Sequence, residues 1–226
     1  MKKIIVTTSW DDGHKLDVKL AELLKKYSIN GTFYVTPKNH EFAARELLTP
    51  DEVVSLSSDF EIGAHTITHV NLSKVGLDVA INEISESRTY LSKLLARDVT
   101  SFCYPYGAYN SDVKRIVKNC GFLLARTVDR FNTEIDDPYE LKTTAQVLSH
   151  PRDAADLKLI SKYKTVAWEK LAKAQFDEVL RKGGVFHLWG HSWEIEKHKN
   201  WEKLEELLKY ISGRKNISYL TNSQLI

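Results

Sequence analysis

Two kinds of hydrophobic pattern alternate along most of this chain. Short runs of β-branched and aromatic residues are typical of strands, whereas segments with apolar residues three or four positions apart are typical of amphipathic helices. The predicted strands span residues 3–8, 31–36, 60–64, 100–104, 122–126, 146–148, 185–189 and 217–220. The predicted helices span residues 16–27, 49–56, 81–95, 112–119, 165–181 and 201–211.

This order of elements predicts an α/β fold. Repeated βα units bring their strands together in a parallel sheet, and seven or eight such units favour a barrel over an open sheet. Two boundaries are well marked, because residues 49–52 form a capping box and Asn30-Gly31 ends the first helix. Residues 129–161 follow neither pattern clearly. No repeat or linker divides the chain, so we expect a single domain over residues 1–226.

Composition is that of a soluble globular protein. Of the 226 residues 42% are hydrophobic and 27% are charged, and the net charge of +2 gives no reason to expect a nucleic-acid partner. No apolar run is long enough to cross a bilayer, and the N-terminal run is too short for a signal peptide. We therefore expect a cytoplasmic protein without a membrane span, and its oligomeric state is not readable. Cys103 and Cys120 are expected to be reduced.

Polar residues gather where the predicted strands end. Residues 11–12 follow the first strand, 65–69 the third, 104–107 the fourth and 187–191 the seventh. In a βα barrel the functional loops lie at these carboxyl ends of the strands. Segments that are distant in sequence are therefore predicted to meet on one rim.

The histidines and the adjacent aspartates suggest a divalent metal. Four-residue spacing would put His65 and His69 on one face of a helical turn. Zinc metalloproteases place a glutamate directly after the first histidine, and Thr66 stands there instead, which excludes that class. Asp11 and Asp12 would repel each other unless a cation lies nearby. A metal held by one aspartate and both histidines would leave the other aspartate as a base. Taken alone, each motif also fits an acidic turn or ordinary surface histidines.

Four motifs in order, SWDDG, HTITH, YPYG and HLWGH, give the chain a specific resemblance. It resembles the polysaccharide deacetylase family, also called the NodB-homology family or carbohydrate esterase family four, from Thr7 to about Glu194. The resemblance implies a distorted, TIM-barrel-like (β/α) barrel with about seven parallel strands. It also implies a divalent metal and the hydrolytic removal of an N-acetyl, or less often an O-acetyl, group from a sugar.

The resemblance assigns roles residue by residue. Asp11 matches the catalytic base, and Asp12, His65 and His69 match the metal ligands. Two histidines and one carboxylate leave coordination positions open for water and for the acetyl oxygen. Zinc is the expected ion, and cobalt, nickel, manganese or iron would accept the same ligands.

Two further roles concern the residues after the fourth and fifth strands. Tyr106 corresponds to the residue whose backbone N–H helps to bind the tetrahedral oxyanion. The arginine that orients the catalytic aspartate in the family is replaced by Cys103. Arg126 is the nearest substitute, and the alternative is that its side chain only lies along the surface at a strand end.

The general acid is expected in the HLWGH motif. We favour His191, because the bend at Gly190 places it beyond the strand end, and His187 within the strand is the alternative. Asp129 lies where the family often has an acidic residue near this histidine. The groove walls are expected from side chains with flat or apolar faces for a sugar ring, namely Trp10, Tyr104, Pro105, Tyr106, Trp189 and Trp193.

These features together predict a metal-dependent hydrolase that releases acetate from an N-acetylated amino sugar or oligo- or polysaccharide. Two alternatives keep the same fold: a sugar-binding protein with weak or no activity, given the missing arginine, and a hydrolase of a non-sugar amide. A non-haem iron oxygenase would use the same three ligands. Such enzymes usually adopt double-stranded β folds, whereas the strands here alternate with helices.

Overall fold

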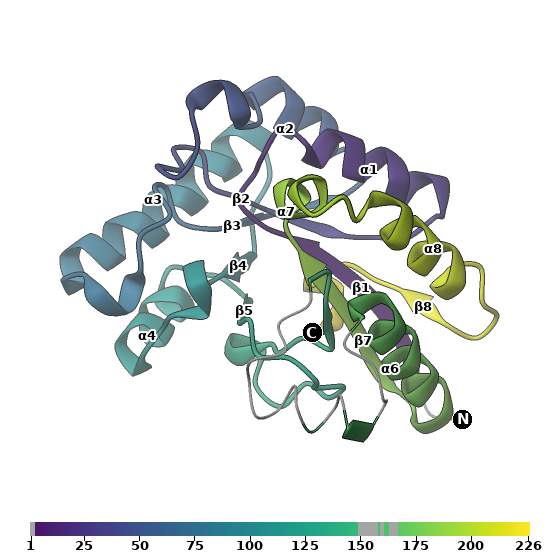
Figure 1. Ribbon diagram of the computed structural model, residues 1–226. Helices are drawn as coiled ribbons and strands as arrows, with labels where there is room; N and C mark the ends of the chain where they lie inside the picture. The colour runs from purple at the N-terminus through teal and green to yellow at the C-terminus, as the bar shows by residue number, and fades with distance from the viewer. Residues whose placement is uncertain (1–2, 149–157, 159–160, 163–166) are drawn as a thin grey trace.

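Parallel strands form one curled sheet, and helices surround it (Figure 1). The computed structural model describes residues 3–148, 158, 161–162 and 167–226. The strands are β1 (Ile4–Trp10), β2 (Thr32–Val35), β3 (Glu61–Ala64), β4 (Ser101–Cys103), β5 (Leu124–Arg126), β6 (Ala145–Gln146), β7 (Gly184–Gly190) and β8 (Ser218–Tyr219). The α-helices are α1 (Asp17–Lys26), α2 (Pro50–Leu56), α3 (Leu77–Leu95), α4 (Ser111–Asn119), α6 (Trp168–Lys182), α7 (Ser192–Lys197) and α8 (Trp201–Ile211).

The distorted barrel predicted from the sequence is confirmed as a curled half-barrel. Seven strands follow the order β5-β4-β3-β2-β1-β7-β6, and β8 pairs with β1 off this path. The capping box at Thr49 is present, with its hydroxyl accepting the N–H of Glu52. The helix predicted over 165–181 begins at Trp168, and residues 165–166 lie outside the described part of the chain. Helix α7 was not predicted.

Strand β1 is the centre of the sheet. It pairs with β7 along its whole length, while its other edge pairs with β8 at Ile5 and Val6 and with β2 at Ser9 and Trp10. Six of its seven residues are buried, because the sheet is covered on both faces. Val6 and Trp10 pack into the hydrophobic core with the apolar face of α1. By alternation, Ser9 points to the opposite side, into the half-barrel.

The interior of the half-barrel is polar. The hydroxyl of Tyr34 accepts a hydrogen bond from the side-chain amide of Asn222, whose oxygen accepts one from Thr7. The hydroxyl of Ser9 lies 2.8 Å from Nε2 of His187. These groups are almost fully buried, so their mutual hydrogen bonds offset much of the cost of removing them from water. The network fixes the strand ends that carry the residues of the site.

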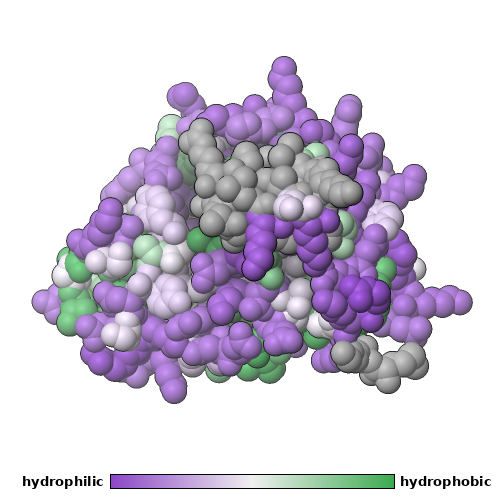
Figure 2. Space-filling model, turned by 60° about the horizontal axis from the view of Figure 1, so that its bottom comes forward, coloured by the Kyte–Doolittle hydropathy of each residue, from purple (hydrophilic) through white to green (hydrophobic). Residues whose placement is uncertain are grey.

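The outer surface is largely hydrophilic on the face drawn in Figure 2, where hydrophobic side chains form small, separate patches. Within the described residues, no helix combines the length and the apolar character needed to cross a membrane.

The burial of His187 predicts how the free energy of unfolding changes with pH. Burial, aided by the charge of Arg126, lowers the pKa of His187 to about 3. In the unfolded chain a histidine has a pKa of about 6.5, so below this pH the unfolded state binds the proton and gains stability. His187→Gln should therefore reduce the loss of unfolding free energy between pH 7 and pH 5 by about 2 kcal/mol, measured by urea unfolding of both metal-free proteins. Equal losses in the two proteins would mean that His187 is already exposed or protonated.

Candidate metal centre and active site

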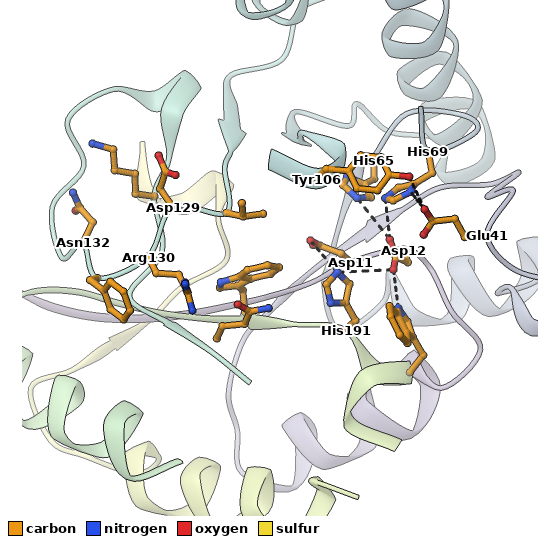
Figure 3. A pocket seen from close by; sticks show the side chains of 16 residues that line it. Asp11, Asp12, Glu41, His65, His69, Tyr106, Asp129, Arg130, Asn132 and His191 are labelled. Carbon is orange, nitrogen blue, oxygen red and sulfur yellow. Dashed lines mark hydrogen bonds and ion pairs between the residues drawn. The ribbon is translucent and has the colours of Figure 1, made fainter. Parts of the chain in front are cut away.

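The carboxyl ends of the parallel strands bring the polar motifs together. Trp10 of β1 is level with Gly190 of β7, and the N–H of Asp11 donates to the carbonyl of Gly190 at 3.1 Å. Ala64, directly before His65, is level with Phe102 of β4. The strand ends surround a pocket of about 1040 Å³, which holds most of the predicted site residues (Figure 3).

Three buried side chains form a candidate metal centre. Oδ1 of Asp12 lies 3.3 Å from Nε2 of His69 and 3.8 Å from Nε2 of His65. Ligand atoms about 2.1 Å from a tetrahedral ion are about 3.4 Å apart, so these separations suit a cation of the size of zinc. Oδ1 of Asp12 has no hydrogen-bond partner in the part of the chain that the structure describes, although its other oxygen accepts the indole N–H of Trp193 at 2.8 Å. A buried carboxylate oxygen without a donor is the position that a cation would fill.

The protonation of His65 also suits a metal ligand. Its Nδ1 lies 2.8 Å from the backbone carbonyl of Cys103, which can only accept a hydrogen bond. Nδ1 therefore carries the proton, and the bare Nε2 faces Asp12. Burial lowers the pKa of His65 to about 4, so the ring is neutral at physiological pH.

The predicted helical turn between the two histidines is wrong. Residues 65–69 form a loop in which Thr66 and His69 have positive φ angles of 63° and 65°. The hydroxyl of Thr66 accepts the N–H of His69 at 3.1 Å, and the carboxylate of Glu83 on α3 accepts the N–H groups of the two residues between them, each at 2.9 Å. This loop brings the rings to a centroid distance of 4.9 Å. Sequence reasoning missed Glu83, because a glutamate on a helix gives no signal of such a contact.

Asp11 is held by a buried arginine. Arg126 at the end of β5 is fully buried and donates from a terminal nitrogen to Oδ1 of Asp11. The alternative that its side chain lies along the surface is therefore wrong. Cys103 is a free thiol 3.7 Å from Oδ2 of Asp11. Burial alone would raise the pKa of Asp11, but the charge and hydrogen bond of Arg126 together with the neighbouring His65 and His191 outweigh it, so the pKa is lowered and Asp11 is an ionised carboxylate.

A second group of potential ligands consists of Asp11, His65 and Cys103. It suits a cation less well than the first group. The guanidinium of Arg126 already contacts Asp11, and burial raises the pKa of Cys103 well above its ordinary value, which keeps the sulfur protonated. We therefore assign the candidate centre to Asp12 and the two histidines.

His191 lies on the other side of the two aspartates from His65 and His69 (Figure 3). Its Nε2 is 4.0 Å from Oδ2 of Asp11 and 3.9 Å from Oδ2 of Asp12, and its Nδ1 is 2.7 Å from Oε2 of Glu194. Burial opposes protonation, but Glu194 and the two aspartates outweigh it and raise the pKa of His191 to about 9. His187 instead points into the polar interior beside Ser9 and does not line the pocket.

The acidic partner of His191 was predicted at the wrong position. Asp129 lines the pocket, but Figure 3 shows it on the far side from His191, among the residues of the loop after β5. Glu194, three residues after His191 on α7, takes the contact instead. An i, i+3 pair on a helix is a signal that the sequence contains, and it could have been found there.

The expected groove walls are only partly correct. Tyr106, Trp189 and Trp193 line the pocket, as does the segment from Val128 to Asn132. The expected contribution of three other residues is wrong, because their side chains are buried in the core: Trp10, Tyr104 and Pro105. The ring of Tyr104, for example, is stacked on Tyr109.

Tyr106 has an unusual backbone conformation. Its φ of 59° lies in the left-handed region, within the short helical turn Pro105–Gly107 that follows β4. The side chain is 53% exposed, and its ring packs on His69 at a centroid distance of 4.7 Å. The turn thereby holds the ring of Tyr106 beside the candidate metal centre.

Comparison with known proteins identifies relatives of this chain. A peptidoglycan-N-acetylglucosamine deacetylase from Bacillus cereus is 30% identical over 108 residues, which are 46% of this chain and 37% of that protein, so the chain spans little more than a third of the relative. The deacetylase PplD of Streptococcus pyogenes, solved with acetate, has a TM-score of 0.56 at 23% identity, covering 60% of this chain and 62% of that one.

A further solved structure shows that the fold extends over the whole chain. The chitin deacetylase of Colletotrichum lindemuthianum has a TM-score of 0.64 at 16% identity, covering 100% of this chain and 88% of that one. The family model described as polysaccharide deacetylase matches residues 1–125, which is more than half of the sequence. This chain therefore belongs to the polysaccharide deacetylase family.

Proposed function

We propose that this chain is a metal-dependent carbohydrate deacetylase. It hydrolyses the N-acetyl group of an amino sugar, alone or within an oligo- or polysaccharide, and releases acetate. The observation that carries this proposal is that an ionised Asp11 and a protonated His191 lie 4.0 Å apart directly beside one candidate metal centre. The N-acetylglucosamine named for the Bacillus relative supports an N-acetylated sugar as the substrate class.

Asp12, His65 and His69 would hold the cation, and a carboxylate with two imidazoles favours zinc. When bound, the cation supplies Lewis-acid activation of water and of the acetyl carbonyl. The two histidines present Nε2 toward Asp12, and the indole of Trp193 fixes the carboxylate of Asp12 from the other side. The ligand set is therefore oriented before a cation enters.

Asp11 acts as the general base. Its ionised carboxylate removes a proton from the attacking water, while Arg126 fixes its orientation and keeps it ionised before the reaction. The backbone N–H of Tyr106 stabilises the negative charge that develops on the acetyl oxygen. His191 then donates its Nε2 proton to the sugar nitrogen, so that the C–N bond breaks and a free amine leaves, and Glu194 stabilises the imidazolium before this transfer.

The structure bears on the alternatives. The inactive sugar-binding alternative rested on the missing arginine, and Arg126 supplies a guanidinium to Asp11 from a different strand. A non-haem iron oxygenase is disfavoured by the parallel sheet with surrounding helices. A non-sugar amide as the substrate can be distinguished from an N-acetylated sugar by comparing turnover of the two.

Removal of the metal should abolish turnover. We expect acetate release from an N-acetylated chitooligosaccharide to fall at least 100-fold after chelation and to return on addition of Zn²⁺, because the cation activates both reactants. His65→Ala should not recover, whereas Glu86→Ala on the exposed face of α3 should behave like the wild type. Acetate release at the full rate by the chelated protein would contradict the proposal, as would binding of the sugar without any release. Turnover of only acetylated non-sugar amines would move the protein to the other substrate class.

Loss of Arg126 should affect both stability and turnover. Arg126→Ala leaves Asp11 as an uncompensated buried charge, so we expect the free energy of unfolding to fall by about 3–5 kcal/mol. We also expect kcat to fall about 100-fold, because Asp11 is no longer oriented. Asp11→Asn in the same background should recover part of the stability and none of the activity. Urea unfolding and acetate release measure the two effects, and wild-type turnover by Arg126→Ala would exclude the positioning role.

The division between base and acid can be tested by changing the leaving group. A sugar amine must be protonated to leave, whereas p-nitrophenolate leaves without a proton. His191→Ala should therefore lower kcat on the N-acetyl sugar by about 100-fold or more and hardly change hydrolysis of p-nitrophenyl acetate. Asp11→Asn should lower both rates. If His187→Gln shows the selective loss and His191→Ala does not, the assignment of the acid is wrong.

A further inference from the structure

A carboxylate that the mechanism does not use reaches the site from a separate loop. Glu41 lies between β2 and α2 and lines the pocket. Its Oε1 accepts the phenol of Tyr106 at 2.5 Å and lies 3.5 Å from Nδ1 of His69 (Figure 3). One oxygen atom therefore faces both a candidate metal ligand and the phenol of Tyr106, the residue proposed to bind the oxyanion.

The loop that carries Glu41 is fixed from several sides. The N–H of Lys38 donates to the carbonyl of Ile67 at 2.9 Å, which ties the loop to the segment between the two histidines. The side chain of Asn39 is buried, and its oxygen accepts the N–H of Glu41 at 3.0 Å. The ring of Phe42 packs edge-on against Trp193 at 5.7 Å. Little conformational freedom therefore remains to be lost when the carboxylate meets its partners.

We propose that Glu41 is a positioning residue that holds His69 and Tyr106 together in the arrangement needed for metal binding and oxyanion binding. This inference rests on the metal centre of the proposed function. Nδ1 of His69 makes no hydrogen bond among the described residues, and Oε1 of Glu41 lies 3.5 Å from it, so this carboxylate is placed to favour a proton on Nδ1. A proton on Nδ1 leaves Nε2, which faces Asp12, bare for the cation.

The two histidines then follow the same logic with different partners. Nδ1 of His65 donates a hydrogen bond to the backbone carbonyl of Cys103, which is held in place by β4. Nδ1 of His69 faces Oε1 of Glu41 at 3.5 Å, and the side chain of Glu41 is 44% exposed, so it acts through orientation more than through a strong charge. A carboxylate behind a metal-bound histidine commonly changes metal affinity 10–100-fold when it is removed.

The second contact of Glu41 is with Tyr106, in the turn after β4. The backbone of Tyr106 is in the left-handed region, which costs free energy and persists only where the surroundings impose it. The phenol is tied to Glu41, and its ring packs on His69.

The test compares variants that remove one or both of the contacts of Glu41 with His69 and Tyr106. Metal-free protein is titrated with Zn²⁺ in competition with a chromophoric chelator, which requires no catalysis. We expect Glu41→Ala to weaken Zn²⁺ binding about 10-fold and Glu41→Gln to weaken it less, because an amide oxygen can still accept one hydrogen bond. Tyr106→Phe should bind Zn²⁺ within about twofold of the wild type and lose kcat only, while Glu86→Ala serves as the matched surface control.

Two results would overturn the inference. One is equal Zn²⁺ affinity in the wild type and both Glu41 variants, and the other is an equal loss in Tyr106→Phe and Glu41→Ala. The ¹⁵N shifts of His69 in the metal-free protein give an independent readout, since the tautomer with Nδ1 protonated should become less populated in Glu41→Ala. A protein that shows the expected order of affinities but releases no acetate would refute the proposed function and leave the role of Glu41 intact.

Discussion

Two adjacent carboxylates are buried at the end of β1, and each needs its own counter-charge. Asp11 and Asp12 are both 2% exposed, so water cannot solvate them. Arg126 neutralises Asp11 from β5, whereas Asp12 receives an indole N–H and turns its other oxygen toward the imidazoles of His65 and His69. The different partners give neighbouring residues different chemistry, because one is fixed as an anion and the other lacks only a cation. The curled sheet makes this possible by placing β5 within reach of the end of β1.

The loops around these carboxylates store backbone strain. Asp12, Thr66, His69 and Tyr106 all have positive φ angles, between 59° and 85°, and none is a glycine. Each costs on the order of 1 kcal/mol or more, so such angles persist only where neighbouring contacts impose them. Glu83 holds the loop of the histidines, and the parallel strands beneath supply a rigid base. The site is thus oriented by its surroundings before any ligand enters, which is the condition for effective electrostatic catalysis.

The sequence predicted most of the strands, because runs buried between helices are strongly apolar and punctuated by turn residues. It also indicated the candidate ligands, since parallel strands bring their carboxyl ends to one rim whatever the loops do. It could not predict contacts between distant segments, such as those of Glu83 and Glu41, because both residues resemble solvent-exposed glutamates in a linear pattern. Tyr104 was misassigned for a related reason. A motif gives the order of residues, whereas stacking on Tyr109 decides which aromatic ring faces inward.

Glu194, and not Asp129, is the carboxylate that contacts His191, the residue proposed as the general acid. At pH 7.5 a histidine with an ordinary pKa would be about one-tenth protonated, whereas the raised pKa of His191 keeps nearly all of it protonated. The carboxylate that contributes to this shift lies in the first turn of α7, three residues after His191, which precedes the helix as its N-cap residue. Asp129 is thereby released from pairing with the acid, and the loop that carries it lines the far part of the pocket instead. The contact that raises the pKa of His191 and the far wall of the pocket therefore come from different segments of the chain.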